Sequence, residues 1–362
     1  MTLRQSPLRS AHEAAGAGFT DFGGWEMPVD FDSIRAEHAA VRNSAGKFDV
    51  SHMGQAVVSG PDAATLTGRL TTNDVGALSS GEAQYAAITD EEGVMLDDTV
   101  VYRLPGDWDG EYLFVPNAGH DGEMADRWES HRTEWGLDAT VENRTEAYAM
   151  VAVQGPDAVD LLDREVEAEL ASLDRFEVTA TRVAGTDALV ARTGYTGEDG
   201  VEVVCRVEDA GAVWSAADCR PCGLGARDTL RIEAGMLLSG QDFDPEEEPR
   251  TPYEAGIGFA VALGTEFVGL DALAAVAEDG PAEKLLGLTL DERGVPRHGY
   301  PVESPDGERV GHVTSGTMSP TLGEPIGLAY LPRAYDKPGR EVCVVVRDEP
   351  KKAHVTATPF LS

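Results

Sequence analysis

Two adjacent aspartates, Asp97 and Asp98, are candidates for chemistry. They stand between a turn rich in Asp, Glu and Gly and a strand-like run over residues 99–102. Because successive residues of a strand face opposite ways, only one of the two carboxylates can point into a site. The other is expected to meet solvent or to cap the turn. Adjacent aspartates at such a junction are usually plain turn residues, so the surrounding elements have to be considered.

The elements that would position such a site show an internal repetition. Strands ending in Gly-Pro-Asp precede amphipathic helices expected over residues 61–74 and 156–170. Proline at a helix start loses no hydrogen bond, and aspartate there favours the positive end of the helix dipole. The repetition predicts two related α+β halves. Residues 203–210 and 285–290 are also predicted to form strands.

The second part of the chain has a different pattern. Residues 241–256 are polar and rich in proline, which is typical of a linking segment. After about Lys284, short strands alternate with turns that contain Gly and Pro. This pattern predicts a small all-β barrel at the C-terminal end.

The composition indicates an unusual solvent. The chain has 362 residues, 42% of them hydrophobic, so it can bury a large core in two or three domains. Its net charge is −35, and its 29 basic residues comprise 24 arginines and five lysines. Acidic residues dispersed along the whole chain indicate a halophile, because a Debye length of about 3 Å in 1 M salt screens their repulsion. Sustained hydrophobic patterning disfavours the alternative of a disordered acidic protein, and the negative field excludes nucleic acid as a partner.

Several other classes of site lack support in the sequence. The four cysteines are too few for a disulfide framework, and the motif from Cys219 to Cys222 has no second pair or nearby histidine to complete a zinc set. The eight histidines show no paired spacing that suits a metal, so we expect no metal site. Neither a signal peptide nor an apolar run of about 18 residues is present, and we expect a cytoplasmic protein that does not enter a membrane.

Six blocks of sequence resemble the aminomethyltransferases (T proteins) of glycine cleavage systems, in the order that this family has them. The paired aspartates fall within the segment GEAQYAAITDEEGVMLDDTVVY, residues 81–102. The blocks that share the resemblance are FGGWEMPV (22–29), EHAAVRNSAGKFDVSHMG (37–54), RTGYTGEDGVE (192–202), GLGARDTLRIEAGM (223–236), GVPRHGYPV (294–302) and GHVTSGTMSPTLGEPIGLAYL (311–331).

The resemblance implies a fold of three domains around a central folate cavity. We therefore predict an α+β protein in which residues 1–255 form a folate-binding catalytic region of two related subdomains. Residues 256–283 are predicted to connect this region to a C-terminal β-barrel domain over residues 284–362.

The resemblance also implies a reaction. An aminomethyl group on the dihydrolipoyl arm of a carrier, the H protein, gives its methylene to the co-substrate tetrahydrofolate, and ammonia is released. A buried carboxylate can stabilise a cationic carbon and accept a proton from a folate nitrogen. The resemblance places this role on Asp98, and its neighbour Asp97 is therefore assigned to the turn, where it would meet solvent or cap the turn.

Folate recognition is predicted for a further set of residues. The pyrimidine edge of a pterin offers adjacent N–H donors that a carboxylate can accept, and Glu202, after the glycines Gly197 and Gly200, is in the right place on a strand. Arg227 could pair with Glu202, bind the pterin oxygen or bind a folate carboxylate. The resemblance adds contacts from side chains that can wall or rim a flat ring: Met53, Tyr85, Asn117 and Tyr195. Arg231 and Glu233 are expected to be ion-pair members on the surface of a helix.

Two other functions share parts of this pattern. A folate-dependent demethylase of the same superfamily, or the folate domain of a sarcosine or dimethylglycine oxidase, is disfavoured by the aspartate pair and by the absence of an attached flavin domain. A non-catalytic folate-binding protein of iron–sulfur assembly would carry a cysteine motif of the type KGCYxGQ. The corresponding region here is RTPYEAG, residues 250–256, and it has no cysteine.

Overall fold

The computed structural model describes residues 2–106 and 108–361. The chain forms two compact units, and several segments contribute to each. The first contains the residues up to Ile88, Asp97–Arg227 and Thr265–Phe267. The second contains Thr89–Leu96, Asp228–Gly264 and the residues from Val268 onwards. The domain boundaries predicted at residues 255 and 284 stay a prediction.

A six-stranded sheet forms the centre of the first unit. Its strands, in spatial order, are β11 (Val178–Val183), β12 (Thr186–Ala191), β13 (Gly200–Arg206), β10 (Tyr148–Gln154), β4 (Gly46–Asp49) and β14 (Arg220–Cys222). Every residue of β10 is buried, because a central strand with apolar side chains on both faces is covered on both sides. The helices α5 (Ala158–Leu162) and α6 (Ala210–Ala216) pack their apolar residues into the same core.

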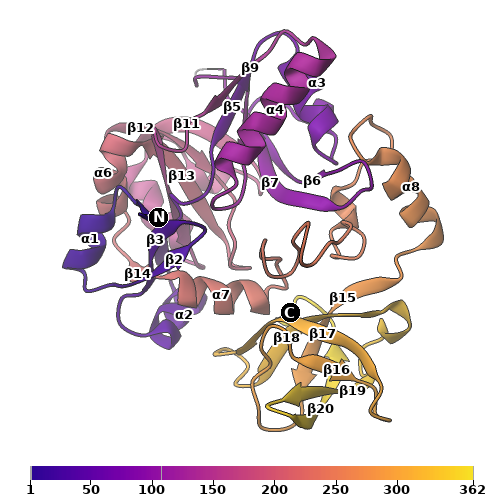
Figure 1. The fold of residues 1–362 in the computed structure, drawn as a ribbon. Helices are drawn as coiled ribbons and strands as arrows, with labels where there is room; N and C mark the ends of the chain where they lie inside the picture. The colour runs from indigo at the N-terminus through magenta and orange to yellow at the C-terminus, as the bar shows by residue number, and fades with distance from the viewer. Residues whose placement is uncertain (1, 107, 362) are drawn as a thin grey trace. The chain divides into compact units, whose positions relative to one another are not determined.

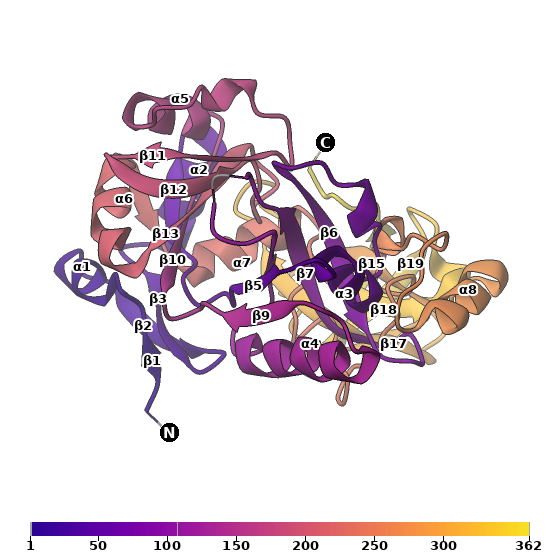
Figure 2. The same ribbon diagram turned by 90° about the horizontal axis from the view of Figure 1, so that it is seen from above.

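A five-stranded sheet in the same unit carries the aspartate pair. Its spatial order is β6 (Glu82–Thr89), β7 (Met95–Arg103), β8 (Tyr112–Val115), β5 (Ala56–Ser59) and β9 (Thr140–Asn143). The helices α3 (Ala63–Leu70) and α4 (Asp121–Trp135) lie beside each other on it (Figure 1, Figure 2). Trp128 of α4 stacks on Phe114 of β8 with ring centroids 4.1 Å apart, which fixes the helix against the sheet.

Helix α4 has clear start and stop signals. His120 is its N-cap residue, and Asp121 and Glu123 place negative charge in the first turn, where the helix dipole favours it. Gly136 ends the helix in the left-handed conformation at φ 64°, and Leu137 N donates to Arg132 O at 3.0 Å.

The two predicted Gly-Pro-Asp helices are present, but both are shorter than expected, since α3 ends at Leu70 and α5 ends at Leu162. After α5 the chain continues as separate 3-10 turns, with Val166 in an extended conformation between them. Val166 forms a β-bridge with Val183, and this pairing takes the segment out of the helix.

The remaining elements of the first unit are short. A three-stranded sheet has the order β1 (Arg4–Gln5), β3 (Trp25–Asp30) and β2 (Gly18–Phe22). The helices are α1 (Arg9–Ala14) and α2 (Ile34–Asn43), and α7 (Leu224–Glu233) runs on into the second unit. The 3-10 turns of the described chain are Val75–Ala77, Asp163–Glu165, Leu170–Ser172, Val207–Asp209, Gly258–Ala260 and Arg333–Tyr335.

The second unit contains the β-barrel that the sequence predicts. Six strands close it in the order β15 (Glu283–Leu290), β18 (Pro325–Pro332), β17 (Arg309–Met318), β16 (Pro301–Glu303), β19 (Glu341–Val346) and β20 (Glu349–Thr356) (Figure 1). Alternate apolar side chains fill its interior, as expected for a barrel of this size. The segment before it includes α8 (Leu270–Asp279).

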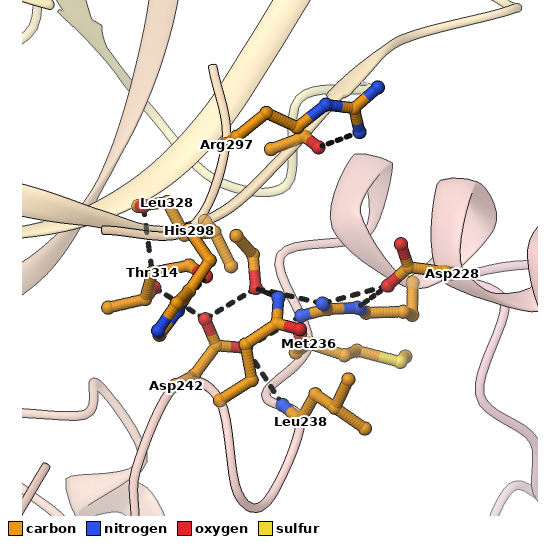
Figure 3. A network of polar contacts seen from close by, with 12 residues as sticks. Asp228, Met236, Leu238, Asp242, Arg297, His298, Thr314 and Leu328 are labelled. Atoms are coloured by element: carbon orange, nitrogen blue, oxygen red, sulfur yellow. Dashed lines mark hydrogen bonds and ion pairs between the residues drawn. The ribbon is translucent and has the colours of Figure 1, made fainter. Parts of the chain in front are cut away.

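A buried polar network around Asp242 anchors the second half of α7 (Figure 3). Asp242 accepts hydrogen bonds from Leu238 N at 2.9 Å, from Arg231 at 2.6 Å and from Ser315 Oγ at 2.6 Å. Thr314 Oγ1 is a further donor. Arg231 and Glu233 are fully buried, and Glu233 accepts from Ser319 and Thr321. The interpretation of these two residues as members of a helix surface is therefore wrong. Their polar spacing gave no sign that a β-barrel strand would cover them.

Candidate active site

Strand pairing brings Asp98 and Asn117 together. In the antiparallel pair of β7 and β8, Val100 lies opposite Val115. The same register continued by two residues sets Asp98 opposite Asn117. Pro116 lacks an N–H and ends β8, so the chain leaves the sheet at this point. Asn117 Nδ2 donates to Asp98 Oδ1 at 2.5 Å and to Asp97 Oδ1 at 2.7 Å, which ties the two carboxylates to one amide.

Asp97 is not a turn residue. It lies within β7, on the same face as Met95 and Thr99, and is fully buried. Its carboxylate accepts the backbone N–H groups of Asn117 and Asp98, both at 3.0 Å. The expectation that Asp97 meets solvent or caps the turn is therefore wrong. The strand begins at Met95, earlier than predicted, so the alternation of faces turns Asp97 inward.

Asp98 points to the opposite face of β7, where Tyr85 of β6 donates its hydroxyl to Asp98 Oδ2. Burial and the charge of Asp97 raise the pKa of Asp98 to about 6, although the hydrogen bonds from Tyr85 and Asn117 oppose the rise. Near neutral pH this carboxyl can therefore either hold or release a proton. Burial, and after it the charge of Asp98, hold the pKa of Tyr85 well above its ordinary value, so its hydroxyl remains a donor.

Glu202 lies in β13, between β12 and β10, where it pairs with Ala191 and Ala152. Thr193 Oγ1 donates to Glu202 Oε2 at 2.6 Å. Burial raises the pKa of Glu202, while this hydrogen bond and the charge of Arg227 act in the other direction. The carboxyl is therefore a partly buried acceptor with one oxygen held by a hydroxyl.

Two glycines shape the turn before Glu202. Gly197 has a φ of 81°, which a side chain would strain. Gly194 has no room for a Cβ, because Gln154 Oε1 would lie 1.8 Å from it. Gln154 also accepts from Thr196 Oγ1 at 2.9 Å, which fixes the loop that carries Tyr195.

Arg227 joins this loop to α7. Its guanidinium carbon lies 4.3 Å from the ring centroid of Tyr195, in a cation–π contact. The complete burial of His52 and the nearby charge of Arg227 together lower the pKa of the His52 imidazole to about 3. His52 is thus neutral and packs edge-on against Phe22 at 5.2 Å.

Met53 is half-buried in the loop after β4, next to His52. Its other neighbour, Gly54, donates its N–H to Pro116 O at 2.8 Å. A Cβ on Gly54 would lie 2.5 Å from Pro116 Cγ, so only glycine lets this loop approach the end of β8. The structure therefore brings the Met53 segment beside the Asn117 segment.

The predicted residues form two groups in the first unit. Asp98, Tyr85 and Asn117 are directly hydrogen-bonded, and Glu202, Arg227 and Tyr195 are linked by charge and ring contacts. The phenol groups of Tyr85 and Tyr195 are close enough that ionisation of one would disfavour ionisation of the other, so the two groups of residues approach each other at these rings. Their folate contacts stay a prediction. Chemically, the site combines an acid–base carboxyl with aromatic walls and a second, partly buried carboxyl.

Sequence reasoning missed Thr193, His52 and His120 as neighbours of these groups. His120 Nδ1 lies 3.2 Å from Asp97 Oδ2. Strand alternation was the available signal for Asp97, because Met95, Asp97 and Thr99 share a parity. No signal in the sequence indicated His120, because its approach to Asp97 depends on how α4 folds back onto the sheet.

In the ranges 2–106 and 108–361, no three His, Cys, Asp or Glu side chains are grouped so that they could hold a metal ion. Burial raises the pKa of the Cys219 thiol to about 11. A thiol of this kind is a poor ligand and nucleophile. Over the same described ranges, no helix is both long and apolar enough to cross a membrane.

Comparison with protein families decides the family of the chain. The model described as "GCVT N-terminal domain" matches residues 8–265, and the model described as "Glycine cleavage T-protein C-terminal barrel domain" matches residues 283–361. The chain belongs to the aminomethyltransferase family of glycine cleavage T proteins. The α+β fold and the C-terminal barrel are those of this family.

Individual relatives support the same assignment. A "Probable aminomethyltransferase" of Haloarcula marismortui is 69% identical over 361 residues, which cover 100% of this chain and 99% of the relative. An "Aminomethyltransferase" of Rubrobacter xylanophilus is 48% identical, with 99% of this chain and 94% of that protein covered. The halophilic origin predicted from the charge fits the first of these relatives.

A solved structure extends the comparison to three dimensions. The crystal structure of the glycine cleavage system aminomethyltransferase T from Bartonella henselae matches with a TM-score of 0.91. The two proteins are 31% identical, and the match covers 99% of this chain and 98% of that one. The predicted fold class is therefore confirmed, and so is the prediction that the chain is an aminomethyltransferase.

Proposed function

We propose that this aminomethyltransferase takes the methylene group from the aminomethyl-dihydrolipoyl arm of an H protein and transfers it to tetrahydrofolate, with release of ammonia. The observation that carries the proposal is the environment of Asp98. This carboxyl is partly buried beside a second, fully buried carboxyl, is held by Tyr85 and Asn117, and has its pKa raised to about 6. A group of this kind suits proton transfer at neutral pH.

The reaction needs two protons to move. The C–S and C–N bonds of the aminomethyl group break, and two C–N bonds to the folate form. Of the two folate N–H protons, one goes to the departing amine, which leaves as ammonia, and one goes to the sulfur, which leaves as a thiol. Ionised Asp98 accepts a folate N–H and stabilises the electron-poor methylene carbon, and protonated Asp98 returns the proton to a leaving group.

Binding of tetrahydrofolate is assigned to the other residues of the site. Glu202 is a partly buried acceptor and suits the N–H donors of the pterin edge. The Tyr195 ring, backed by the Arg227 guanidinium, and the thioether of Met53 offer apolar surface to a flat ring. Tyr85 and Asn117 already bond to Asp98 and set its orientation toward the substrate.

The test is an assay with aminomethylated, lipoylated H protein and tetrahydrofolate in molar KCl. We expect methylenetetrahydrofolate and ammonia to form in equal amounts, and unmodified H protein serves as the control. Ammonia without methylenetetrahydrofolate would overturn the assignment of the acceptor. Product formed from a free N-methyl amino acid, with none from the carrier, would favour a folate-dependent demethylase instead.

A further inference from the structure

A histidine stands beside the aspartate pair without a role in the proposed reaction. His120 precedes α4 as its N-cap residue, and its Nδ1 lies 3.2 Å from Oδ2 of the fully buried Asp97. About a third of the His120 side chain is exposed, since its relative exposure is 31%, whereas Asp97 has none. His120 therefore connects the fully buried Asp97 to a position that solvent reaches.

The contacts form a continuous chain of partners. His120 faces Asp97, Asp97 accepts from Asn117, Asn117 donates to Asp98, and Asp98 accepts from Tyr85. Asn117 is placed by its neighbours, because its backbone N–H and its amide both donate to Asp97. A change at Asp97 is thus transmitted to Asp98 both by charge and by the orientation of one amide.

Two adjacent carboxylates do not ionise independently. When one is charged, it disfavours a charge on the other, and the second carboxyl keeps its proton to a higher pH. A cation next to Asp97 offsets this repulsion. We propose that His120 is a positioning residue that acts through Asp97, and that its positive charge allows Asp98 to ionise at the pH at which the enzyme works. This inference rests on the proposed function of Asp98.

The charges around His120 agree with this role. The carboxylate of Asp97 is the largest influence, and it raises the pKa of the imidazole against the effect of burial. Glu123, the third residue of α4, and Asp98 also raise the pKa of His120. The three charged groups that act on His120, Asp97, Glu123 and Asp98, are all acidic, so the imidazolium form is favoured toward neutral pH.

The first experiment compares variants that differ in charge. His120→Gln removes the cation, and we expect the acidic limb of kcat/KM against pH to move upward by about half a unit or more. His120→Arg keeps a cation and should leave the limb near its wild-type position. A residue that only supported the fold would lose activity equally in both variants, with no movement of the limb.

His131 provides a matched control on the same helix. It lies eleven residues further along α4, about 16 Å at 1.5 Å per residue, and stacks against Trp135. His131→Gln should leave the acidic limb unchanged. If His120→Gln left the limb unchanged as well, or if His131→Gln moved it equally, the proposal would be overturned.

A second experiment needs no substrate. The imidazole of His120 can be titrated by NMR in protein labelled at its eight histidines, with His120→Gln used for the assignment. Asp97→Asn should lower the midpoint of His120 by at least about one unit, because its nearest anion is removed. Unchanged signals from the other histidines would show that the variant is folded.

The two experiments separate the two possible failures. A wild-type protein that formed no methylenetetrahydrofolate would overturn the proposed function, and the role of His120 in it. An active wild-type protein whose His120 midpoint did not respond to Asp97→Asn would overturn the inference alone.

Discussion

Asp98→Asn should make the protein more stable and far less active. Folding raises the pKa of this carboxyl from 3.8 to about 6, mainly because it is buried. At about 1.4 kcal/mol per unit, this rise corresponds to about 3 kcal/mol of stability that is lost when the carboxyl ionises. Asparagine keeps the shape and never ionises. Its oxygen can accept from Asn117, and its amide can donate to the Tyr85 hydroxyl.

The pH dependence has a definite sign. Below pH 3.8 the carboxyl is protonated in both the folded and the unfolded chain, and its stabilising contribution is fully present. Between 3.8 and about 6 the folded protein binds more protons than the unfolded chain, so the free energy of unfolding falls as the pH rises. Above pH 6 the loss is complete. We therefore expect Asp98→Asn to match the wild type near pH 4 and to exceed it by up to about 3 kcal/mol at pH 7.

The measurement is urea unfolding at a fixed molar KCl concentration across this pH range, together with turnover at each pH. Turnover of Asp98→Asn should fall by about 100-fold or more, with folate affinity nearly unchanged. Asp97→Asn is the control. It should lose stability, because Asp97 accepts three N–H groups, and should move the acidic limb downward by removing a like charge from Asp98. Its loss of activity should be milder. An equal difference in stability between Asp98→Asn and wild type at pH 4 and pH 7 would refute the reasoning, and so would full activity of Asp98→Asn.

Three further predictions concern other parts of the chain. Glu202→Gln should weaken tetrahydrofolate binding by about 1–3 kcal/mol in calorimetric titration, because one acceptor becomes a donor. Glu208→Gln, at an exposed position, should leave the affinity unchanged. Equal affinities of the two variants would remove Glu202 from the site. Asp242→Asn should destabilise the fold by about 3 kcal/mol in urea unfolding, because the buried Arg231 loses its ionised partner, and an effect no larger than that of the exposed Glu247→Gln would contradict this. Raising KCl from about 0.1 to 3 M should increase the melting temperature and activity together, with a smaller gain from sucrose. The reason is that the net charge is −35 and the Debye length falls from about 10 Å to below 3 Å over this range. A melting temperature that stayed flat would exclude adaptation to salt.

The sequence was informative where a residue's partners are close along the chain or in a regular register. The barrel followed from short apolar strands between turns, and the helix starts at α3 and α5 followed from Gly-Pro-Asp. The meeting of Asp98 with Tyr85 and Asn117 follows from three consecutive neighbours in one sheet, β6, β7 and β8, although only the family resemblance selected these residues.

Residues whose environment depends on distant segments were assigned wrongly or missed. Asp97 was placed in the turn because β7 begins at Met95, four residues before the strand that the composition indicates. Arg231 and Glu233 have the spacing of a solvated helix face, but Ser315 and Ser319 bond to them from more than 80 residues away. His120 approaches Asp97 because Trp128 holds α4 on Phe114, and no local pattern encodes that contact.

The acidic residues of this protein fall into two kinds, which differ in what compensates their charge. The many exposed carboxylates depend on dissolved salt, since screening by ions acts on charges that solvent reaches. Asp97 and Asp242 are fully buried, Asp98 and Glu202 are partly buried, and each has named partners within the fold: Asn117, Arg231, Tyr85 and Thr193. Buried pairs are screened much less, so salt should change the stability of the whole chain while the protonation of Asp98 continues to be set by its neighbours. An enzyme built in this way can carry a very acidic surface and still keep a carboxyl that titrates near neutral pH, because the two properties reside in separate sets of residues.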